Sequence, residues 1–330
     1  MDWWLHSVFA PAIAVCGALL LDTLFGEPKK WHPLIGFGNI VYWVEEKLNT
    51  PATRDTLISQ IQGIAAWLLA VFPIVGGLFW GVSLVGNVSF VWNVCLDVAI
   101  LYVCIGQKSL LDHAGWIHQP LQAGDLGEAR EKVGWIVSRE TEQMSEYQIT
   151  SAAIESVLEN GNDAVFGTLF WFILLGAPGA ILFRLANTLD AMWGYKSPRF
   201  NSFGFFAAKA DDFMGYLPAK ATAYSYAILG NTKNAMKCWK AQAKSCSSPN
   251  GGPVMTSGAG ALNIKIGGPA MYHGKMHDKI YMGSGDLAKP EDIPRACRLI
   301  VRTSLLWCSV LIVLALAMLD WNAVLSGANL

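Results

Sequence analysis

Four long apolar runs constrain what this chain can fold into more than any other feature of its sequence. They cover residues 3–21, 61–86, 88–106 and 299–319, and Pro11 interrupts the first of them. A helix needs about 20 mainly apolar residues to cross the hydrocarbon core of a bilayer. The sequence therefore predicts a mainly α, polytopic membrane protein that crosses the membrane within these four runs.

A fifth apolar run, over residues 164–185, is broken in its middle. Gly176-Ala177-Pro178-Gly179 divides it into halves that are each too short to span a bilayer. Broken backbone is tolerated at membrane depth where protein or water satisfies its polar groups. The segment is either a kinked span or a re-entrant hairpin, and the distribution of charge favours the hairpin.

Polar residues concentrate in the segments 22–60, 107–163 and 187–298, which hold most of the 24 Lys and Arg residues. If the broken run re-enters, all three segments lie on one side, which the positive-inside rule identifies as cytoplasmic. The net charge of −1 gives no basic field for binding nucleic acid. We expect one integrated domain over residues 1–330, embedded in membrane lipid, with no nucleic-acid partner.

The polar segments contain signals of ordered structure. Asp125 is expected to cap a helix that runs to about Val137, and Ser145 is expected to cap a second helix. A third helix is predicted over residues 222–243. Residues 245–285 are rich in Gly, Ser, Pro and Asn, which is typical of an ordered ligand-binding loop or a flexible linker.

Three acidic residues, Glu155, Glu159 and Asp163, follow one another at nearly helical spacing. Glu155 and Glu159 are four residues apart, so their carboxylates lie on one helix face and repel each other slightly. The group is either a solvated helix face with Asp163 as a cap, or a carboxylate cluster that holds Mg²⁺ or orients a nucleophile.

A second acidic group combines Asp190, in a motif that begins with Asn187, with the adjacent pair Asp211 and Asp212. Carboxylates beside a membrane surface suit a Mg²⁺–phosphate site, because Mg²⁺ prefers oxygen ligands and keeps several waters. The alternative is that they solubilise a loop and cap helices. Lys220 nearby either neutralises phosphate charge or marks the border of the membrane.

Other short motifs contain candidate substrate ligands. Arg139, which follows Ser138 between two predicted helices, either completes a turn or recognises a carboxylate or phosphate. His32 is more typical of a structural loop histidine. The glycine-rich turns at 248–252 and 267–269 are able to cradle a phosphate with backbone N–H groups, but neither fits the nucleotide-binding pattern G-x-x-x-x-G-K-[ST].

In this order, these motifs resemble the adenosylcobinamide-phosphate synthase (cobinamide synthase) family, membrane enzymes of cobalamin biosynthesis. The resemblance covers most of the chain, and its motifs are short but ordered alike. They are Asp22…Gly26-Glu27-Pro28…His32-Pro33, Ser138-Arg139-Glu140-Thr141, Glu155-Ser156…Glu159-Asn160…Asp163, Asn187-Thr188-Leu189-Asp190…Gly194-Tyr195, Asp211-Asp212, Pro218-Ala219-Lys220, Ser248-Pro249-Asn250 and Gly267-Gly268-Pro269…Tyr272. The chain departs from the family at Lys220, where Arg is common, and in the stretch that follows Asn250.

The resemblance implies a ligase-type amide synthase in the bacterial inner membrane, with its active site facing the cytoplasm. A carboxylate of adenosylcobyric acid would be joined to the amine of (R)-1-aminopropan-2-ol or its O-phosphate. ATP and Mg²⁺ are implied, because the carboxylate needs activation, here as an acyl phosphate that the amine attacks. Other enzymes of the pathway are further candidate partners.

On this basis we predict roles for the motif residues. Glu155, Glu159 and Asp163 are the expected catalytic residues, and Asp190, Asp211 and Asp212 are the expected Mg²⁺ ligands. The expected substrate-binding residues are His32, Ser138, Arg139, Asn187, Lys220, Asn250, Gly267, Gly268 and Tyr272.

Three other functions compete with this interpretation. A Mg²⁺-dependent membrane prenyltransferase also uses Asp-rich motifs, but Asp190 stands alone and Asp211-Asp212 lacks a following acid. A transporter predicts repeated broken helices and charges at the midplane, whereas this chain has one broken run. A non-catalytic scaffold leaves the carboxylate groups unexplained.

Overall fold

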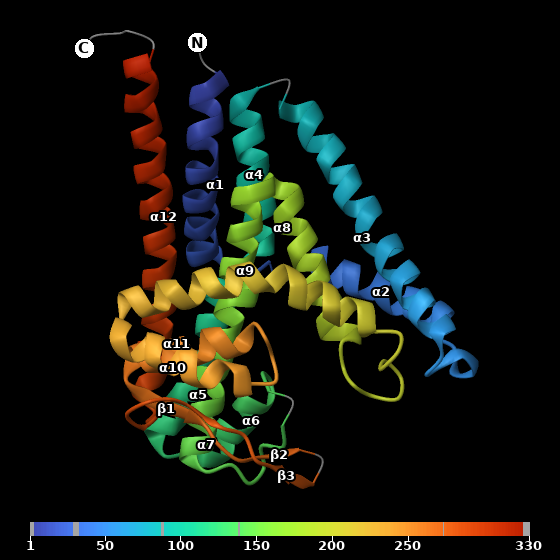
Figure 1. Ribbon diagram of the computed structural model, residues 1–330, viewed down its shortest axis with the longest axis vertical. Coiled ribbons are helices and arrows are strands. Elements are labelled where there is room, and N and C mark those ends of the chain that lie inside the picture. The colour runs from blue at the N-terminus through green and yellow to red at the C-terminus, as the bar shows by residue number, and fades with distance from the viewer. Residues whose placement is uncertain (1–2, 29–32, 87–88, 138, 273, 326–330) are drawn as a thin grey trace. The chain divides into compact units, whose positions relative to one another are not determined.

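The structure, a computed structural model, describes residues 3–28, 33–86, 89–137, 139–272 and 274–325 (Figure 1). These residues form two compact units, each built from separate stretches of the chain. Unit 1 comprises Met1–Gly106, Gly167–Met214 and Trp307–Leu330, and unit 2 comprises Gln107–Phe166 and Gly215–Leu306. The single integrated domain expected from the sequence stays a prediction.

Unit 1 is built from long apolar helices. They are α1 (Trp3–Phe25), α2 (Pro33–Leu48), α3 (Leu57–Gly86), α4 (Phe90–Cys104), α8 (Gly167–Trp193), the first part of α9 (Phe205–Leu229) and the last part of α12 (Asp292–Leu325), with a short 3-10 helix, η1 (Pro51–Thr53). Among the described residues, four helical stretches are long and apolar enough to cross a membrane, namely Leu57–Leu84, Phe90–Ala123, Glu146–Trp193 and Asp292–Met318. Helix α1 adds a shorter apolar stretch, Phe9–Phe25. The prediction of a mainly α, polytopic membrane protein is confirmed.

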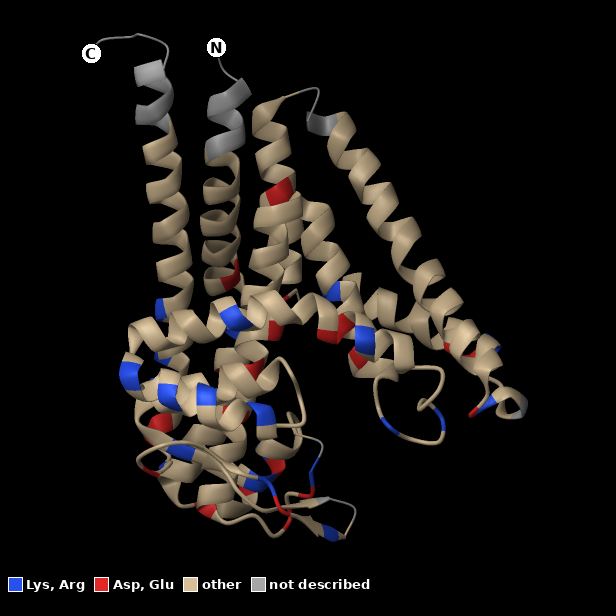
Figure 2. Ribbon diagram, viewed as in Figure 1, with Lys and Arg blue, Asp and Glu red and all other residues tan. Residues whose placement is uncertain are grey.

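The helix ends of unit 1 follow the pattern expected from the charges. The start of α1, the end of α3, the start of α4 and the end of α12 lie at one end of this unit (Figure 1). The helices leading to that end carry few charged side chains (Figure 2), and one of these is Asp97 within α4. These are the parts of the sequence that lack Lys and Arg.

The broken apolar run forms a hairpin within α8. Gly176 has φ 67° and ψ −159°, a backbone region that is open essentially to glycine alone. A Cβ added to Gly179 would lie 2.4 Å from the Trp171 carbonyl oxygen, although residues eight apart in a straight helix are separated by about 12 Å along its axis. The chain therefore turns back at Gly176, and Figure 1 shows the two limbs of α8 close to α4.

An apolar core fixes the end of α8, which carries Asp190. Leu189 and Trp193 of this helix are buried together with residues from α2 and α3 and with Phe203. After the helix, the guanidinium of Arg199 donates to Glu45 of α2, with 3.0 Å from Nε to Oε1. The last turn of α8 and the loop that follows are thus held against α2.

Unit 2 combines short helices with two small sheets. Its helices are α5 (Gln107–Ala123), α6 (Leu126–Gly134), α7 (Glu146–Gly161), a π-helical turn η2 (Asn162–Phe166), the second part of α9, α10 (Thr232–Gln242), η3 (Ala243–Ser245), α11 (Gly251–Leu262) and the first part of α12. Strand β1 (Ile264–Gly267) pairs antiparallel with β4 (Tyr281–Gly283) and parallel with β5 (Asp286–Leu287), while β2 (Ala270–Tyr272) pairs antiparallel with β3 (Lys275–His277).

Helices α7 and α11 form the buried centre of unit 2. Most residues of both helices are buried. Small residues permit this packing, since a Cβ at Gly258 of α11 would lie 2.6 Å from the side chain of Leu158 on α7. The expected cap is present, because Ser145 and Gln148 form a capping box at the start of α7. The candidate acids on α7 are therefore presented from a rigid element.

Two expectations for the polar segments are wrong in detail. The helix predicted over 222–243 is two helices, because α9 ends at Leu229 and Asn231 caps α10 by accepting from the Asn234 N–H, 3.1 Å away. Residues 245–285 are not mainly loop, because they contain α11 and four short strands. The helix capped by Asp125 is confirmed, and it ends at Gly134.

The hairpin predicts a sharp sensitivity at Gly179. In the variant Gly179→Ala the added methyl meets the Trp171 carbonyl and the Leu175 Cβ, so we expect a loss of stability of about 1–3 kcal/mol, typical of overpacking. Gly77→Ala in α3 is the matched control, since no atom lies within 4 Å of its added methyl. Thermal unfolding of the detergent-solubilised variants checks this, and equal midpoints would contradict the hairpin contact.

Candidate active site

The acids of α7 occupy three different environments in unit 2. Glu155 is buried, and Glu159 and Asp163 are half-buried. Asp163 lies in the π-helical turn that follows α7, a distortion that is frequent at functional sites. The helical spacing in the sequence therefore identified a real row of acids, whose neighbours differ from one position to the next.

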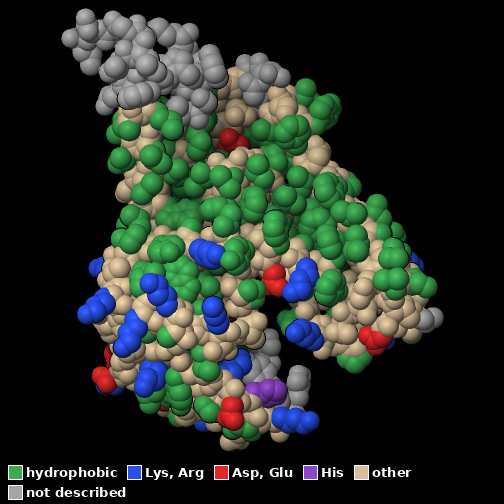
Figure 3. Space-filling model, viewed as in Figure 1, with side chains coloured by type: hydrophobic (Ala, Val, Ile, Leu, Met, Phe, Trp, Pro, Cys, Tyr) green, Lys and Arg blue, Asp and Glu red, His purple; other side chains and the backbone are tan. Residues whose placement is uncertain are grey.

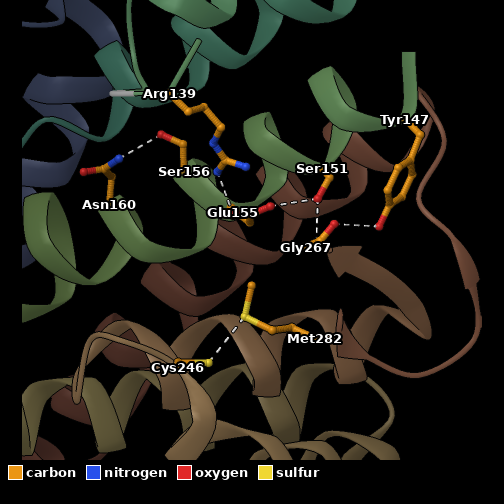
Figure 4. Close-up of polar contacts among 9 residues, drawn as sticks. All are labelled: Arg139, Tyr147, Ser151, Glu155, Ser156, Asn160, Cys246, Gly267 and Met282. Carbon is orange, nitrogen blue, oxygen red and sulfur yellow. Dashed lines mark hydrogen bonds and ion pairs between the residues drawn. The ribbon is translucent and has the colours of Figure 1, made fainter. Parts of the chain in front are cut away.

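Glu155 lies at the centre of a hydrogen-bonded chain (Figure 4). The Arg139 guanidinium donates to its Oε2 over 2.7 Å, and the Ser151 hydroxyl donates to its Oε1 over 2.8 Å. Ser151 in turn accepts from the Gly267 N–H at 2.6 Å, while the Tyr147 hydroxyl donates to the Gly267 carbonyl at 3.1 Å. This chain, the Arg139–Glu155 network, links α7 to the end of β1.

The Arg139–Glu155 pair is almost dry. The two side chains are 11% and 9% exposed. A buried ion pair is tolerated when further hydrogen bonds satisfy its atoms, and Ser151 provides one of these to Glu155. The pair therefore fixes the position of both charged groups, and it neutralises Glu155.

The Gly267-Gly268 motif is a consequence of close packing at this point. Both residues have positive φ, of 84° and 89°. A Cβ at Gly267 would lie 2.6 Å from the Ile280 carbonyl oxygen, and one at Gly268 would lie 2.7 Å from the Tyr281 ring. The turn therefore requires glycine at both positions, which brings the Gly267 amide within reach of Ser151.

Two cavities lie beside the Arg139–Glu155 network, and Gly267 lines both. One has a volume of about 150 Å³ and includes Arg139, Gln143 and Ser151 in its wall. The other has a volume of about 290 Å³ and includes Glu155, Cys246 and Lys279. The network is thus the wall between two hollows that are each large enough for a small polar molecule.

Glu159 lies at the N-terminus of α11. A Cβ added to Gly251, the first residue of that helix, would lie 2.2 Å from the Glu159 Oε1. A carboxylate is favoured there because the first N–H groups of a helix carry partial positive charge. Asn250 is positioned by a similar contact, since a Cβ at Gly215 would meet its Nδ2 at 2.4 Å. Glycines at 215 and 251 therefore make room for two predicted site residues.

Cys246 borders the larger cavity but is not an activated nucleophile. Burial raises the pKa of its thiol, and the negative charges of Glu159 and Glu155 raise it further. Its Sγ lies 3.6 Å from the Met282 Sδ. A thiol in these surroundings stays protonated at neutral pH, so covalent catalysis through a thiolate is disfavoured.

Asp163 interacts with α9 of unit 2. Its Oδ1 accepts from the Asn162 Nδ2 at 2.9 Å, and Asn162 accepts from the buried Thr222 hydroxyl at 3.0 Å. Burial raises the pKa of the Tyr226 hydroxyl well above its usual value, and the charge of Asp163 adds to this effect. Asp163 is therefore integrated into the packing of α7 on α9.

The other acidic group belongs to unit 1. Asn187 donates to the Asp211 Oδ1 over 3.3 Å, while Asp190 and Asp212 are close enough to repel each other. Lys209 neutralises part of this charge through an ion pair of 3.3 Å with Asp212. The motif that contains Asp190 and the Asp211-Asp212 pair thus meet within unit 1. Convergence of these acids with those of α7 stays a prediction.

Close packing explains the glycine at position 194 in the motif that contains Asp190. A Cβ at Gly194 would lie 2.0 Å from the Asp190 Oδ1, and its N–H donates to the Asp190 carbonyl at 2.6 Å. The Asp190 carboxylate therefore packs directly against the backbone of Gly194, where a side chain would occupy its space.

Within the part of the chain that the structure describes, no group of three or more His, Cys, Asp and Glu side chains is arranged to hold a metal ion. Mg²⁺ rarely needs such a cage, because one or two carboxylates and substrate phosphates complete its shell together with water. The Asp190–Asp212 pair fits that smaller requirement. Magnesium binding by Asp190, Asp211 and Asp212 stays a prediction.

Of the remaining predicted substrate ligands, the structure describes Lys220 but not the side chains of three others. Lys220 is half-buried and lies over the ring of Tyr216, 3.7 Å from Nζ to the ring centre. His32, Ser138 and the side chain of Tyr272 lie outside the described residues. Sequence reasoning missed Ser151 and Tyr147, although Ser151 precedes Glu155 by four residues, which is a detectable helical spacing.

The buried ion pair predicts an unequal cost for two charge deletions. Arg139→Ala leaves Glu155 buried without its counter-charge, so we expect a loss of about 3–5 kcal/mol in the free energy of unfolding. Lys108→Ala removes an ion pair with Asp112 that is 37% and 44% exposed, which is expected to contribute less than about 1 kcal/mol. Chemical denaturation of both variants in detergent measures the difference, and similar losses would show that the Arg139 pair is not dry.

Comparison with known proteins identifies the family. The family model described as CobD/Cbib protein matches residues 15–300. A protein named cobalamin biosynthesis protein CobD from Chromobacterium violaceum is 47% identical over 295 residues, 89% of this chain and 93% of the relative. A protein of the same name from Stutzerimonas stutzeri is 46% identical over 306 residues, 93% of this chain and 97% of the relative.

More distant relatives agree with these two. A protein named cobalamin biosynthesis protein CbiB from Salmonella typhimurium is 33% identical over 313 residues, 91% of this chain and 96% of the relative. No solved structure matches the chain. The match of the family model and these identities together show that the chain belongs to the CobD/CbiB family.

Proposed function

We propose that this protein is an ATP- and Mg²⁺-dependent amide synthase that joins adenosylcobyric acid to (R)-1-aminopropan-2-ol or its O-phosphate. The product is adenosylcobinamide or its phosphate. Membership of the CobD/CbiB family supports a role in cobalamin biosynthesis, since the relatives carry that name. The amide-forming step within that role is the part that we add.

The observation that carries the proposal is the Arg139–Glu155 network beside the 290 Å³ cavity. Ligand pockets of drug-sized molecules start at about 300 Å³, so this cavity suits the small amine rather than a corrinoid. Its wall offers both signs of charge, with the carboxylate of Asp278 and the ammonium of Lys279. An amino alcohol and its phosphate carry the complementary charges.

The charges and positions of residues in unit 2 support amide formation as the proposed reaction. A carboxylate and an ammonium ion do not condense unaided, because the amine must lose a proton and the carboxylate needs a leaving group. Glu159 is the better candidate for the base, since Glu155 is neutralised by Arg139. Arg139 and Ser151 also border the 150 Å³ cavity, where they would orient a second polar group.

Activation of the carboxylate is assigned to ATP with Mg²⁺, which supplies the phosphoryl group when bound. The Asp190–Asp212 pair of unit 1 would hold the metal ion, with Asn187 and Lys209 fixing the neighbouring aspartates. A divalent cation between two carboxylates offsets their mutual repulsion, which supports this assignment.

We place the site on the cytoplasmic side of a bacterial inner membrane. The support is the concentration of Lys and Arg in the polar segments and their scarcity at the outer helix ends of unit 1. The positive-inside rule then orients those segments toward the cytoplasm. ATP and the corrinoid would be available on that side.

The assignment of Glu159 predicts a selective loss of activity. Glu159→Gln keeps the size of the side chain but removes the base, so we expect the rate constant for amide formation to fall by about 10²–10⁴-fold. Purified protein in nanodiscs is incubated with adenosylcobyric acid, aminopropanol phosphate and Mg²⁺-ATP, and the corrinoid product is measured by mass. Glu131→Gln, an exposed acid on α6, is the control and is expected to keep its activity.

The metal assignment predicts a different signature. Asp212→Asn is expected to abolish ATP-dependent product formation while membrane insertion and the unfolding midpoint stay unchanged, since Asp212 is half-buried near the end of the unit 1 part of α9. Glu46→Gln on α2 is the matched exposed control. Full activity of Asp212→Asn would refute the metal role, and absence of any corrinoid amide with the unaltered protein would overturn the proposed function itself.

A further inference from the structure

Helix α10 presents a face of lysines that the proposed reaction does not use. The lysines recur at intervals of four, three and four residues, which places them on one side of a helix. They are Lys233, Lys237 and Lys240 of α10 and Lys244 of the 3-10 helix η3 that follows it. All four are exposed, while Ala235 and Cys238 on the opposite side are buried. Among the described residues, no ion pair involves any of these lysines.

The neighbouring part of α9 presents an apolar face. Its members lie at helical spacing and are 48–64% exposed. They are Tyr216, Leu217, Tyr224 and Ile228. Trp239 of α10 joins them, because its ring packs edge-on against Tyr224 with 4.8 Å between the ring centres. We call these five residues and the four lysines of α10 and η3 the lysine–aromatic surface.

The charged residues of this stretch of the sequence, apart from histidine, are all lysines. Residues 213–277 contain seven Lys and no Asp or Glu. Blue segments recur along α10 in Figure 2, and Figure 3 shows hydrophobic side chains bordered by Lys and Arg on the same side of unit 2. A run of this length without an acid would attract an anionic partner, and the apolar residues would enter a phase less polar than water.

The continuation of α12 from unit 2 into a candidate membrane span indicates that the partner is a membrane surface. Helix α12 leaves unit 2 after Leu306 within the candidate span Asp292–Met318. The chain of unit 2 therefore continues without a break into a segment that is long and apolar enough to enter a bilayer. A polar unit joined to such a segment is kept at a high effective concentration near the lipid headgroups.

We propose that the lysine–aromatic surface docks unit 2 onto anionic phospholipid headgroups of the leaflet that α12 enters. Tyr and Trp prefer the membrane–water interface, where their rings sit among the headgroups. Clusters of four or more basic residues on an amphipathic helix bind anionic lipid. The surface combines both features, and it lies outside the residues assigned to catalysis.

Hydrogen exchange in nanodiscs tests the proposal with the full chain. One set of discs contains phosphatidylcholine alone, and the other contains equal parts of phosphatidylcholine and phosphatidylglycerol. We expect backbone amides of residues 216–228 and 233–244 to exchange about tenfold more slowly in the anionic discs, because each lysine near the surface adds to the attraction. Added salt should remove the difference, since about 1 M salt shortens the screening length to about 3 Å.

Two variants decide whether the lysines of α10 and η3 are responsible. Replacing Lys233, Lys237, Lys240 and Lys244 by Gln is expected to abolish the difference between the two lipids, and replacing the same four by Arg to retain it. The control with an equal loss of charge replaces Lys108, Lys132, Lys275 and Lys289 by Gln, and it is expected to keep the difference.

Equal exchange in both lipids would overturn the proposal, as would lipid-dependent protection that survives in the α10 Gln variant. Protection of these peptides by added RNA or by a soluble protein, but not by phosphatidylglycerol, would also overturn it. Amide synthesis is measured separately on the same samples, so a failure of docking is distinguishable from a failure of the proposed reaction.

Discussion

The buried pairing of Arg139 with Glu155 is the interaction on which the candidate site of unit 2 depends. Two charges taken out of water are stable only when further hydrogen bonds hold them, and Ser151, which accepts from the Gly267 N–H, supplies one to Glu155. The pair therefore links the order of α7, the turn after β1 and the walls of two cavities. Loosening one of these elements would expose the charges and disturb the others.

The structure also separates three acids that look alike in the sequence. Glu155 is held by Arg139 in dry surroundings, whereas Glu159 lies at the positive end of a helix dipole. Asp163 is engaged with Asn162 and with the buried part of α9. Equal spacing along the chain thus produced three environments, and the proposed function rests on the differences between them.

Much of the fold was predictable because its signals are local. The apolar runs, the cap at Ser145 and the break around Pro178 each depend on a few neighbouring residues, and each has its expected counterpart in the structure. The helix over 222–243 was wrong because apolar and basic residues continue across Gly230 without a change in period. Gly230 and the cap at Asn231 divide it, and a single Gly-Asn step is a weak signal within a long helical pattern.

The site was less predictable, since its contacts join distant parts of the chain. No local pattern reveals that Ser151 accepts a hydrogen bond from Gly267, which is 116 residues away. The motif residues themselves were found because glycines and acids recur in a known order. The reasons for those glycines, at 194, 251 and 267, became clear only from the groups that they approach.

The contact between Gly251 and Glu159 has an evolutionary consequence. Because a methyl group at residue 251 would occupy the space of the carboxylate oxygen, the two positions are not free to drift separately. Alanine at 251 becomes sterically acceptable only after the side chain at 159 has shortened or swung aside. Sequences that descend from this chain should therefore show epistasis between the two sites, because a bulkier residue at 251 requires the side chain at 159 to move or to shorten.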